Sequence, residues 1–138
     1  MSDERPIYVL DSYALLAYLG AETGMRRVKE VLKEATQGNC EVLHSIINLG
    51  EVLYITEREL GIASAHAALA AVEQLPIQIL PATKEVVLAA AHVKANFRVA
   101  YADAFAIVSA QEFTATLLTG DPEFEQVKDI VKIEWLDH

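Results

Sequence analysis

The chain has 138 residues, a net charge of −9, a pI near 4.8 and 53% hydrophobic residues. This length suits one domain, and the hydrophobic content supports a buried core and argues against wholesale disorder. The acidity argues against a broad basic surface for generic nucleic-acid binding, although it leaves room for a local cationic groove.

The cysteine content and the hydropathy of the sequence indicate the cellular compartment in which the protein is found. Cys40 is the only cysteine, so no disulfide can form within the chain, which fits a reducing compartment. The first residues carry mixed charges and too short an apolar run for a signal peptide. No segment approaches the roughly 18 uninterrupted apolar residues of a spanning helix. We therefore expect one soluble, cytoplasmic domain over residues 1–138, with no membrane partner.

Short apolar runs alternate with helical patterns along the whole chain. The expected strands are residues 7–10, 41–43, 77–80, 115–119 and 131–136. The expected helices are residues 13–19, 22–35, 46–60 after the N-cap Ser45, 64–74, 84–95 and 101–113. The last of these helices is apolar nearly all round and should be buried. This order predicts an α/β fold, with a mostly parallel central sheet of four to five strands flanked by helices on both faces.

Two aspartates follow strands of this predicted sheet. Ligands of such folds bind beyond the carboxyl ends of the strands, where Asp11 and Asp121 are expected. Each also has a structural interpretation, because Asp11 can cap the next helix and Asp121 lies in a Gly-Asp-Pro turn. The neighbouring hydroxyls of Ser12 and Thr119 could orient a carboxylate or a water, or act as caps.

Two further acids lie on apolar helices. Glu51 falls between Ile47 and Ile55 on one helix side, near the buried edge. Arg58 lies on the same side and could pair with it; the alternative is a partly exposed Glu51 at the margin of the apolar stripe. Asp103 begins the most apolar helix, where a first-turn acid also favours the helix dipole.

The four acids come from four separate parts of the chain. If they converge on one edge of the sheet, their repulsion disfavours full ionisation, and a divalent cation relieves it. Mg²⁺ takes oxygen ligands, and such a site polarises a phosphoryl oxygen and lowers the pKa of a bound water. The pattern therefore predicts a metal site suited to displacement at phosphorus.

Four segments in order carry a family resemblance. "VLDSYALLAYL", "INLGEVLY", "YADAFAIVSA" and "LLTGDPEF" resemble the successive motifs of the PIN-domain family of metal-dependent ribonucleases. They span nearly the whole chain, and the resemblance is closest to the VapC toxins of type II toxin–antitoxin pairs.

The resemblance implies roles for particular residues. Asp11, Glu51, Asp103 and Asp121 would hold Mg²⁺ or Mn²⁺, with Ser12 and Thr119 as supporting neighbours and Glu123 as a further acid close by. It implies hydrolysis of RNA by a metal-activated water, a homodimer, and a cognate antitoxin that blocks the site. Candidates for phosphate contacts are Arg26, Arg27, Arg58 and Arg98.

Two other functions compete with this interpretation. A haloacid-dehalogenase-like phosphatase needs a second aspartate two residues after the first, but Tyr13 occupies that position. The alternative of another class is a PIN-fold module that binds RNA or protein with little or no catalysis. The histidines show no metal-ligand spacing and are expected in the core or on the surface: His44, His66, His92 and His138.

Overall fold

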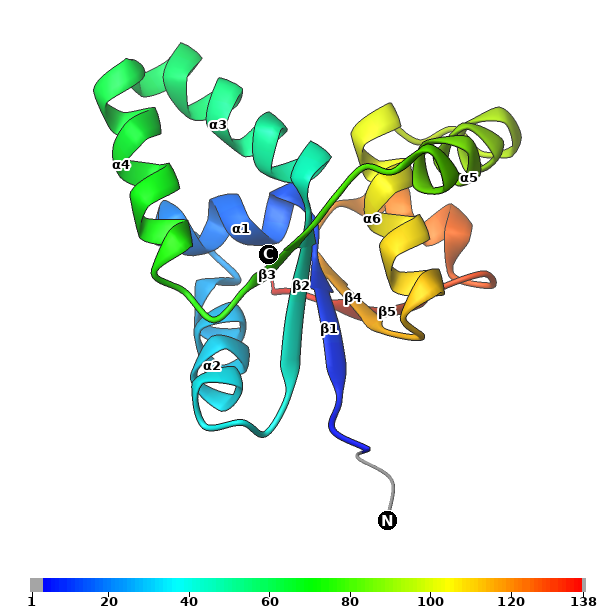
Figure 1. Ribbon diagram of the computed structural model, residues 1–138, viewed down its shortest axis with the longest axis horizontal. Coiled ribbons are helices and arrows are strands. Elements are labelled where there is room, and N and C mark those ends of the chain that lie inside the picture. The colour runs from blue at the N-terminus through cyan, green and yellow to red at the C-terminus, as the bar shows by residue number, and fades with distance from the viewer. Residues whose placement is uncertain (1–3, 138) are drawn as a thin grey trace.

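The computed structural model describes residues 4–137, and its centre is a five-stranded sheet in which every pairing is parallel (Figure 1). Its strands, in spatial order, are β3 (Gln78–Leu80), β2 (Glu41–Ser45), β1 (Ile7–Leu10), β4 (Thr116–Thr119) and β5 (Lys132–Trp135). The predicted α/β class and parallel sheet are confirmed.

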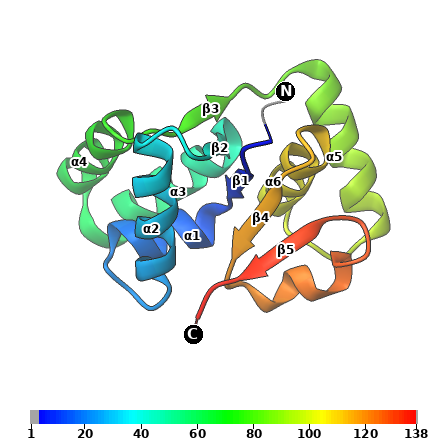
Figure 2. The same cartoon turned by 90° about the horizontal axis from the view of Figure 1, so that it is seen from below.

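Helices cover both faces of this sheet, as predicted. The helices are α1 (Ser12–Leu19), α2 (Met25–Thr36), α3 (Ile46–Leu60), α4 (Ile62–Glu73), α5 (Lys84–Asn96), α6 (Tyr101–Glu112) and the 3₁₀ helix η1 (Pro122–Val127). The view from below shows α1 to α4 on one side of the strands and α5 and α6 on the other (Figure 2). No helix within residues 4–137 is long and apolar enough to cross a bilayer.

Alternating side chains of the strands supply two cores. Val9, Leu43 and Leu117 face α5 and α6, whereas Leu10 and Leu118 face α1 and α2. A smaller apolar cluster joins α1, α3 and α4, and Ile79 of the edge strand β3 packs against it. Every residue of α6 from 103 to 110 is buried, which confirms the prediction from its all-round apolar sequence.

The element boundaries differ from the sequence prediction at identifiable places. Helix α2 begins at Met25 rather than at residue 22, because Gly24 takes the left-handed φ of 96°. Ser45 ends β2 and at the same time caps α3, accepting a hydrogen bond from the Ile47 N–H. The sequence prediction had no element at η1, which starts at a proline after the cap Asp121.

The strand order creates a switch point at the centre of the sheet. From β1 the chain first builds β2 and β3 on one side and later β4 and β5 on the other. Strands β1 and β4 are therefore neighbours whose following segments diverge, and ligands of such folds bind beyond the carboxyl ends of these strands. Asp11 and Asp121 follow these two strands.

Candidate metal centre

Asp11 is held rigidly at the end of β1. Its side chain is 1% exposed; Oδ1 accepts a hydrogen bond from the Ala14 N–H at 2.8 Å and Oδ2 accepts one from the Thr119 hydroxyl at 2.5 Å. The predicted capping of α1 is thus confirmed. Burial raises the pKa of Asp11 to about 7, and the negative charges of Asp103 and Asp121 add to this rise.

Thr119 links the ends of β1 and β4. Besides donating to Asp11, its Oγ1 accepts a hydrogen bond from the Asp121 N–H at 3.0 Å, and it is fully buried. Asp121 in turn caps η1 by accepting from the Glu123 N–H at 2.9 Å. The turn passes close to α1, since a Cβ on Gly120 would lie 2.3 Å from Tyr13 Cε1. A side chain at position 120 would have to displace the Tyr13 ring.

Three carboxylates gather beside this turn. Asp103, Asp121 and Glu123 each offer an oxygen within 4.8 Å of the others. Asp103 is only 8% exposed. Burial raises its pKa to about 7, with contributions from the charges of Asp121, Glu51 and Glu123. Glu123, expected only as a neighbour, belongs to this closest group.

Glu51 lies on α3, near enough to Asp103 for its charge to act there. It is half-buried on α3, and its charge contributes to the raised pKa of Asp103. Of the two alternatives for Glu51, the partly exposed one holds, because the Arg58 guanidinium lies over the Tyr54 ring, 5.5 Å from its centroid. Instead, the Tyr54 hydroxyl donates a long hydrogen bond of 3.5 Å to Glu51.

Ser12 and Asn48 tie three helices together beneath the acids. The Asn48 amide is fully buried and donates to Ser12 Oγ at 3.2 Å and to the Ala102 carbonyl at 3.0 Å. Ser12 Oγ donates to the Asn48 carbonyl at 3.3 Å. Ser12 therefore positions α1 against α3 through its hydroxyl. The sequence analysis missed Asn48, although an amide in an apolar stripe one turn before Glu51 signals a buried partner.

His44 supports the same strand end from inside the core. It is fully buried, and its Nδ1 lies 2.7 Å from the Leu10 carbonyl oxygen. Burial lowers its pKa to about 4, so the ring is neutral at physiological pH and Nδ1 carries the proton that it donates. This is the core histidine that the sequence analysis allowed, and it holds the peptide that precedes Asp11.

No basic side chain neutralises the acidic group. Within residues 4–137, Asp11, Glu51, Asp103, Asp121 and Glu123 form no ion pair with lysine or arginine. Arg27 is already engaged, because its Nε donates to Glu134 at 2.6 Å and its guanidinium also reaches Glu30. Buried, mutually repelling carboxylates without a protein cation have the charge and donor atoms that suit a hard divalent metal ion.

The comparison with protein-family models identifies the fold family. The PIN-domain model matches residues 8–130. The chain belongs to the PIN-domain family. Among curated proteins, no sequence relative of this PIN domain was found.

Solved structures share this fold at low sequence identity. A chain of VapBC2 from Rickettsia felis, crystallised with a promoter DNA fragment, has a TM-score of 0.75 and 16% identity, with 95% of this chain and 99% of that chain covered. VapC20 from Mycobacterium tuberculosis, described as a sarcin–ricin loop cleaving toxin, has a TM-score of 0.72 and 17% identity, with 87% of this chain and 94% of that chain covered. A chain of DNA-bound VapBC from Salmonella typhimurium has a TM-score of 0.71 and 16% identity, with 94% of this chain and 97% of that chain covered. These three neighbours thus come from VapBC systems or, for VapC20, are described as a toxin.

Proposed function

We propose that this PIN domain is a metal-dependent endoribonuclease and the toxin of a toxin–antitoxin pair. The observation that carries the proposal is the crowding of acids at the sheet switch point with no basic partner. The similarity to VapC20 supports it, since that protein is described as a sarcin–ricin loop cleaving toxin. We further propose that residues 1–138 act as one nuclease domain.

Asp11, Glu51, Asp103 and Asp121 would hold Mg²⁺ or Mn²⁺, and Glu123 lies close enough to Asp103 and Asp121 to join them. When bound, the ion would supply an activated water and an electrophile for the phosphoryl oxygen. The chain's own contribution is positional. Thr119 fixes one oxygen of Asp11 and the backbone of Asp121, while Asn48 fixes the base of α3 and α6.

The acidic group accounts for the need for a cation. With raised pKa values, Asp11 and Asp103 are partly protonated near neutral pH in the metal-free protein. Metal binding would release these protons, so the affinity for Mn²⁺ should rise with pH. This dependence can be measured without any RNA.

A matched purification tests the activity. The wild-type protein and Asp103→Asn would be purified in parallel and incubated with single-stranded and stem-loop RNAs, with Mg²⁺, with Mn²⁺ or with EDTA. We expect cleavage only by the wild type with metal. Cleavage that survives EDTA, or that persists equally in Asp103→Asn, would contradict the proposal and indicate a contaminating nuclease.

The partners follow from the same proposal. We propose a homodimer and a cognate antitoxin, because several structural neighbours come from VapBC complexes. Co-expression with the product of the adjacent small reading frame should give a complex that lacks nuclease activity. A chain that never cleaves RNA but binds a protein partner tightly would favour the binding-module alternative.

A further inference from the structure

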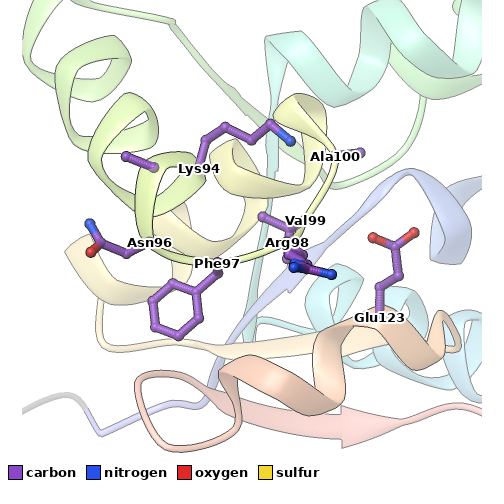
Figure 3. Close-up of a pocket in the computed structure, with 8 residues that line it drawn as sticks. Lys94, Asn96, Phe97, Arg98, Val99, Ala100 and Glu123 are labelled. Atoms are coloured by element: carbon purple, nitrogen blue, oxygen red, sulfur yellow. The ribbon is translucent and has the colours of Figure 1, made fainter.

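An open pocket lies directly beside the acidic group. It has a volume of about 560 Å³ and is formed by the end of α5, residues 97–100 and Glu123 (Figure 3). Glu123 thus borders both the acidic group and this pocket. We refer to five of its lining residues as the basic pocket: Lys94, Phe97, Arg98, Ala100 and Glu123.

The two cations of the pocket, Lys94 and Arg98, outnumber its acid, Glu123. Lys94 and Arg98 are exposed, and neither forms an ion pair within the described part of the chain. In Figure 3 the Arg98 side chain extends toward the side on which Glu123 lies. This contrasts with Arg27, which is fully engaged by Glu134. In a chain of net charge −9, two cations that form no ion pair within residues 4–137 and lie beside the acidic group are suited to an anionic ligand.

The backbone of Arg98 is fixed rather than mobile. The Gln126 side chain accepts a hydrogen bond from the Arg98 N–H at 2.9 Å and donates one to the Arg98 carbonyl at 2.9 Å. Its amide also donates to the Glu123 carbonyl at 3.1 Å. One side chain of η1 therefore holds both the loop with the cation and the turn with the acid. Such fixing lowers the entropy cost of binding a ligand between them.

The remaining wall can accommodate a base and a phosphate. Phe97 is half-buried and gives the pocket an aromatic side chain next to its cations. Helix α6 begins at the pocket, and its N-cap Ala100 has no side chain that could bond the first-turn N–H groups. These N–H groups favour negative charge nearby. Cations, an aromatic and a helix N-terminus together match a nucleotide.

We propose that the basic pocket binds the nucleotide next to the scissile bond of a single-stranded RNA segment, with Arg98 and Lys94 on its phosphate. This inference rests on the proposed ribonuclease function and specifies where its substrate lies. Gln126 then acts as a positioning residue that keeps Arg98 beside the acids. Because the protein has a net charge of −9, we expect its contact with the RNA phosphate to be confined to this pocket.

The test separates RNA binding from cleavage. Binding of a short fluorescent single-stranded RNA would be measured by anisotropy in EDTA at several salt concentrations, and KM and kcat would be measured with Mg²⁺. For Arg98→Ala we expect KM and Kd to rise about tenfold, with kcat little changed. The slope of the logarithm of the binding constant against the logarithm of the salt concentration (the salt slope) should fall in magnitude by about 1. Lys94→Ala should act in the same direction, and Arg98→Lys should restore part of the affinity.

Two variants sharpen the result. Gln126→Ala keeps every charge, so it should raise KM while leaving the salt slope unchanged. Lys29→Ala removes an exposed cation on α2, far from the pocket, and should leave KM, kcat and Kd as in the wild type. Circular dichroism and thermal melting would show that each variant folds.

The outcomes distinguish this inference from the proposed function. If the wild type cleaves RNA and Arg98→Ala matches Lys29→Ala in KM and Kd, the basic pocket is not a substrate site although the nuclease assignment stands. If the wild type never cleaves but binds RNA through Arg98, the pocket is supported and the nuclease assignment fails. A kcat loss at unchanged KM would overturn the phosphate-binding role.

Discussion

Asp11 and Glu123 belong to the same acidic group, but their surroundings differ sharply. Asp11 is 1% exposed and both of its oxygens accept hydrogen bonds, whereas Glu123 is exposed and its carboxylate accepts none within residues 4–137. A buried, hydrogen-bonded carboxylate has one position, but an exposed one can move and is screened by water. The effect of removing each acid should therefore follow its burial.

The largest effect is expected at Asp11. Asp11→Asn keeps the cap on α1, because the amide oxygen can still accept from Ala14, but it removes the charge. We expect the cleavage rate to fall about 100- to 1,000-fold, the scale of losing one fixed group that stabilises charge. Rates with Mg²⁺ and with Mn²⁺, and a circular dichroism spectrum, would be recorded. A rate close to that of the wild type would show that the buried carboxylate of Asp11 is not needed for cleavage.

A smaller effect is expected when the support of Asp11 is removed. Thr119→Val keeps the shape but loses the bonds to Asp11 and to the Asp121 N–H. Metal affinity should fall about 10- to 100-fold, as for other residues that orient metal ligands. Titration calorimetry with Mn²⁺ measures this change. Thr116→Val, on the same strand β4, is the matched control and should bind Mn²⁺ like the wild type, since Thr116 has no side-chain hydrogen bond within residues 4–137.

The stability of the metal-free protein should depend on pH through Asp11. Its pKa is raised from 3.8 to about 7, so between these values the folded chain binds a proton that the unfolded chain has lost. Stability therefore decreases as pH rises through this window and stays low above it. In EDTA, Asp11→Asn should melt about 5 °C above the wild type at pH 8.

The same comparison at low pH provides the control. At pH 4 the wild-type carboxyl is protonated in the folded state, so the melting temperatures of the two proteins should approach each other. Both retain His44, so its own titration cancels in the difference. A constant difference across the whole pH range would mean that Asp11 does not titrate as described.

The smallest effects should come from the accessible acids. Glu123→Gln and Glu51→Gln change side chains that are exposed and half-buried, respectively. We expect each to lower the cleavage rate about tenfold or less, because water can partly replace an exposed carboxylate. Steady-state rates of both variants beside Asp11→Asn would give the ranking. A larger loss for Glu123→Gln than for Asp11→Asn would show that proximity to Asp103 matters more than burial.

Much of the fold was predictable because its signals are local. Apolar runs bounded by turn residues marked the strands, and the continuous apolar pattern of residues 101–113 predicted the buried helix α6. Asp11 and Asp121 could be placed at one edge because parallel strands align their carboxyl ends. The boundary of α2 and the existence of η1 were not predicted, since each depends on the backbone conformation of a few turn residues.

Contacts between distant segments explain what the sequence analysis missed. Asn48 joins α1, α3 and α6, and Gln126 holds the loop at Arg98; both bond residues that lie far away along the chain. The partners of the arginines could not be predicted either, since Arg27 pairs with Glu134 across 107 positions and Arg98 forms no ion pair within residues 4–137. Side-chain amides and guanidinium groups carry no periodic signal that identifies such partners.

The sequence alone determined the α/β class, the mostly parallel sheet and the acids that the strands and helices carry, because periodicity, caps and the alternation of strands with helices can be read along the chain. Only the tertiary structure decided how near these acids lie, which of them are buried and which cations are left unpaired. Burial and charge coupling arise when elements pack together, and they raise the pKa values of Asp11 and Asp103. The chemistry proposed for this PIN domain depends on that packing.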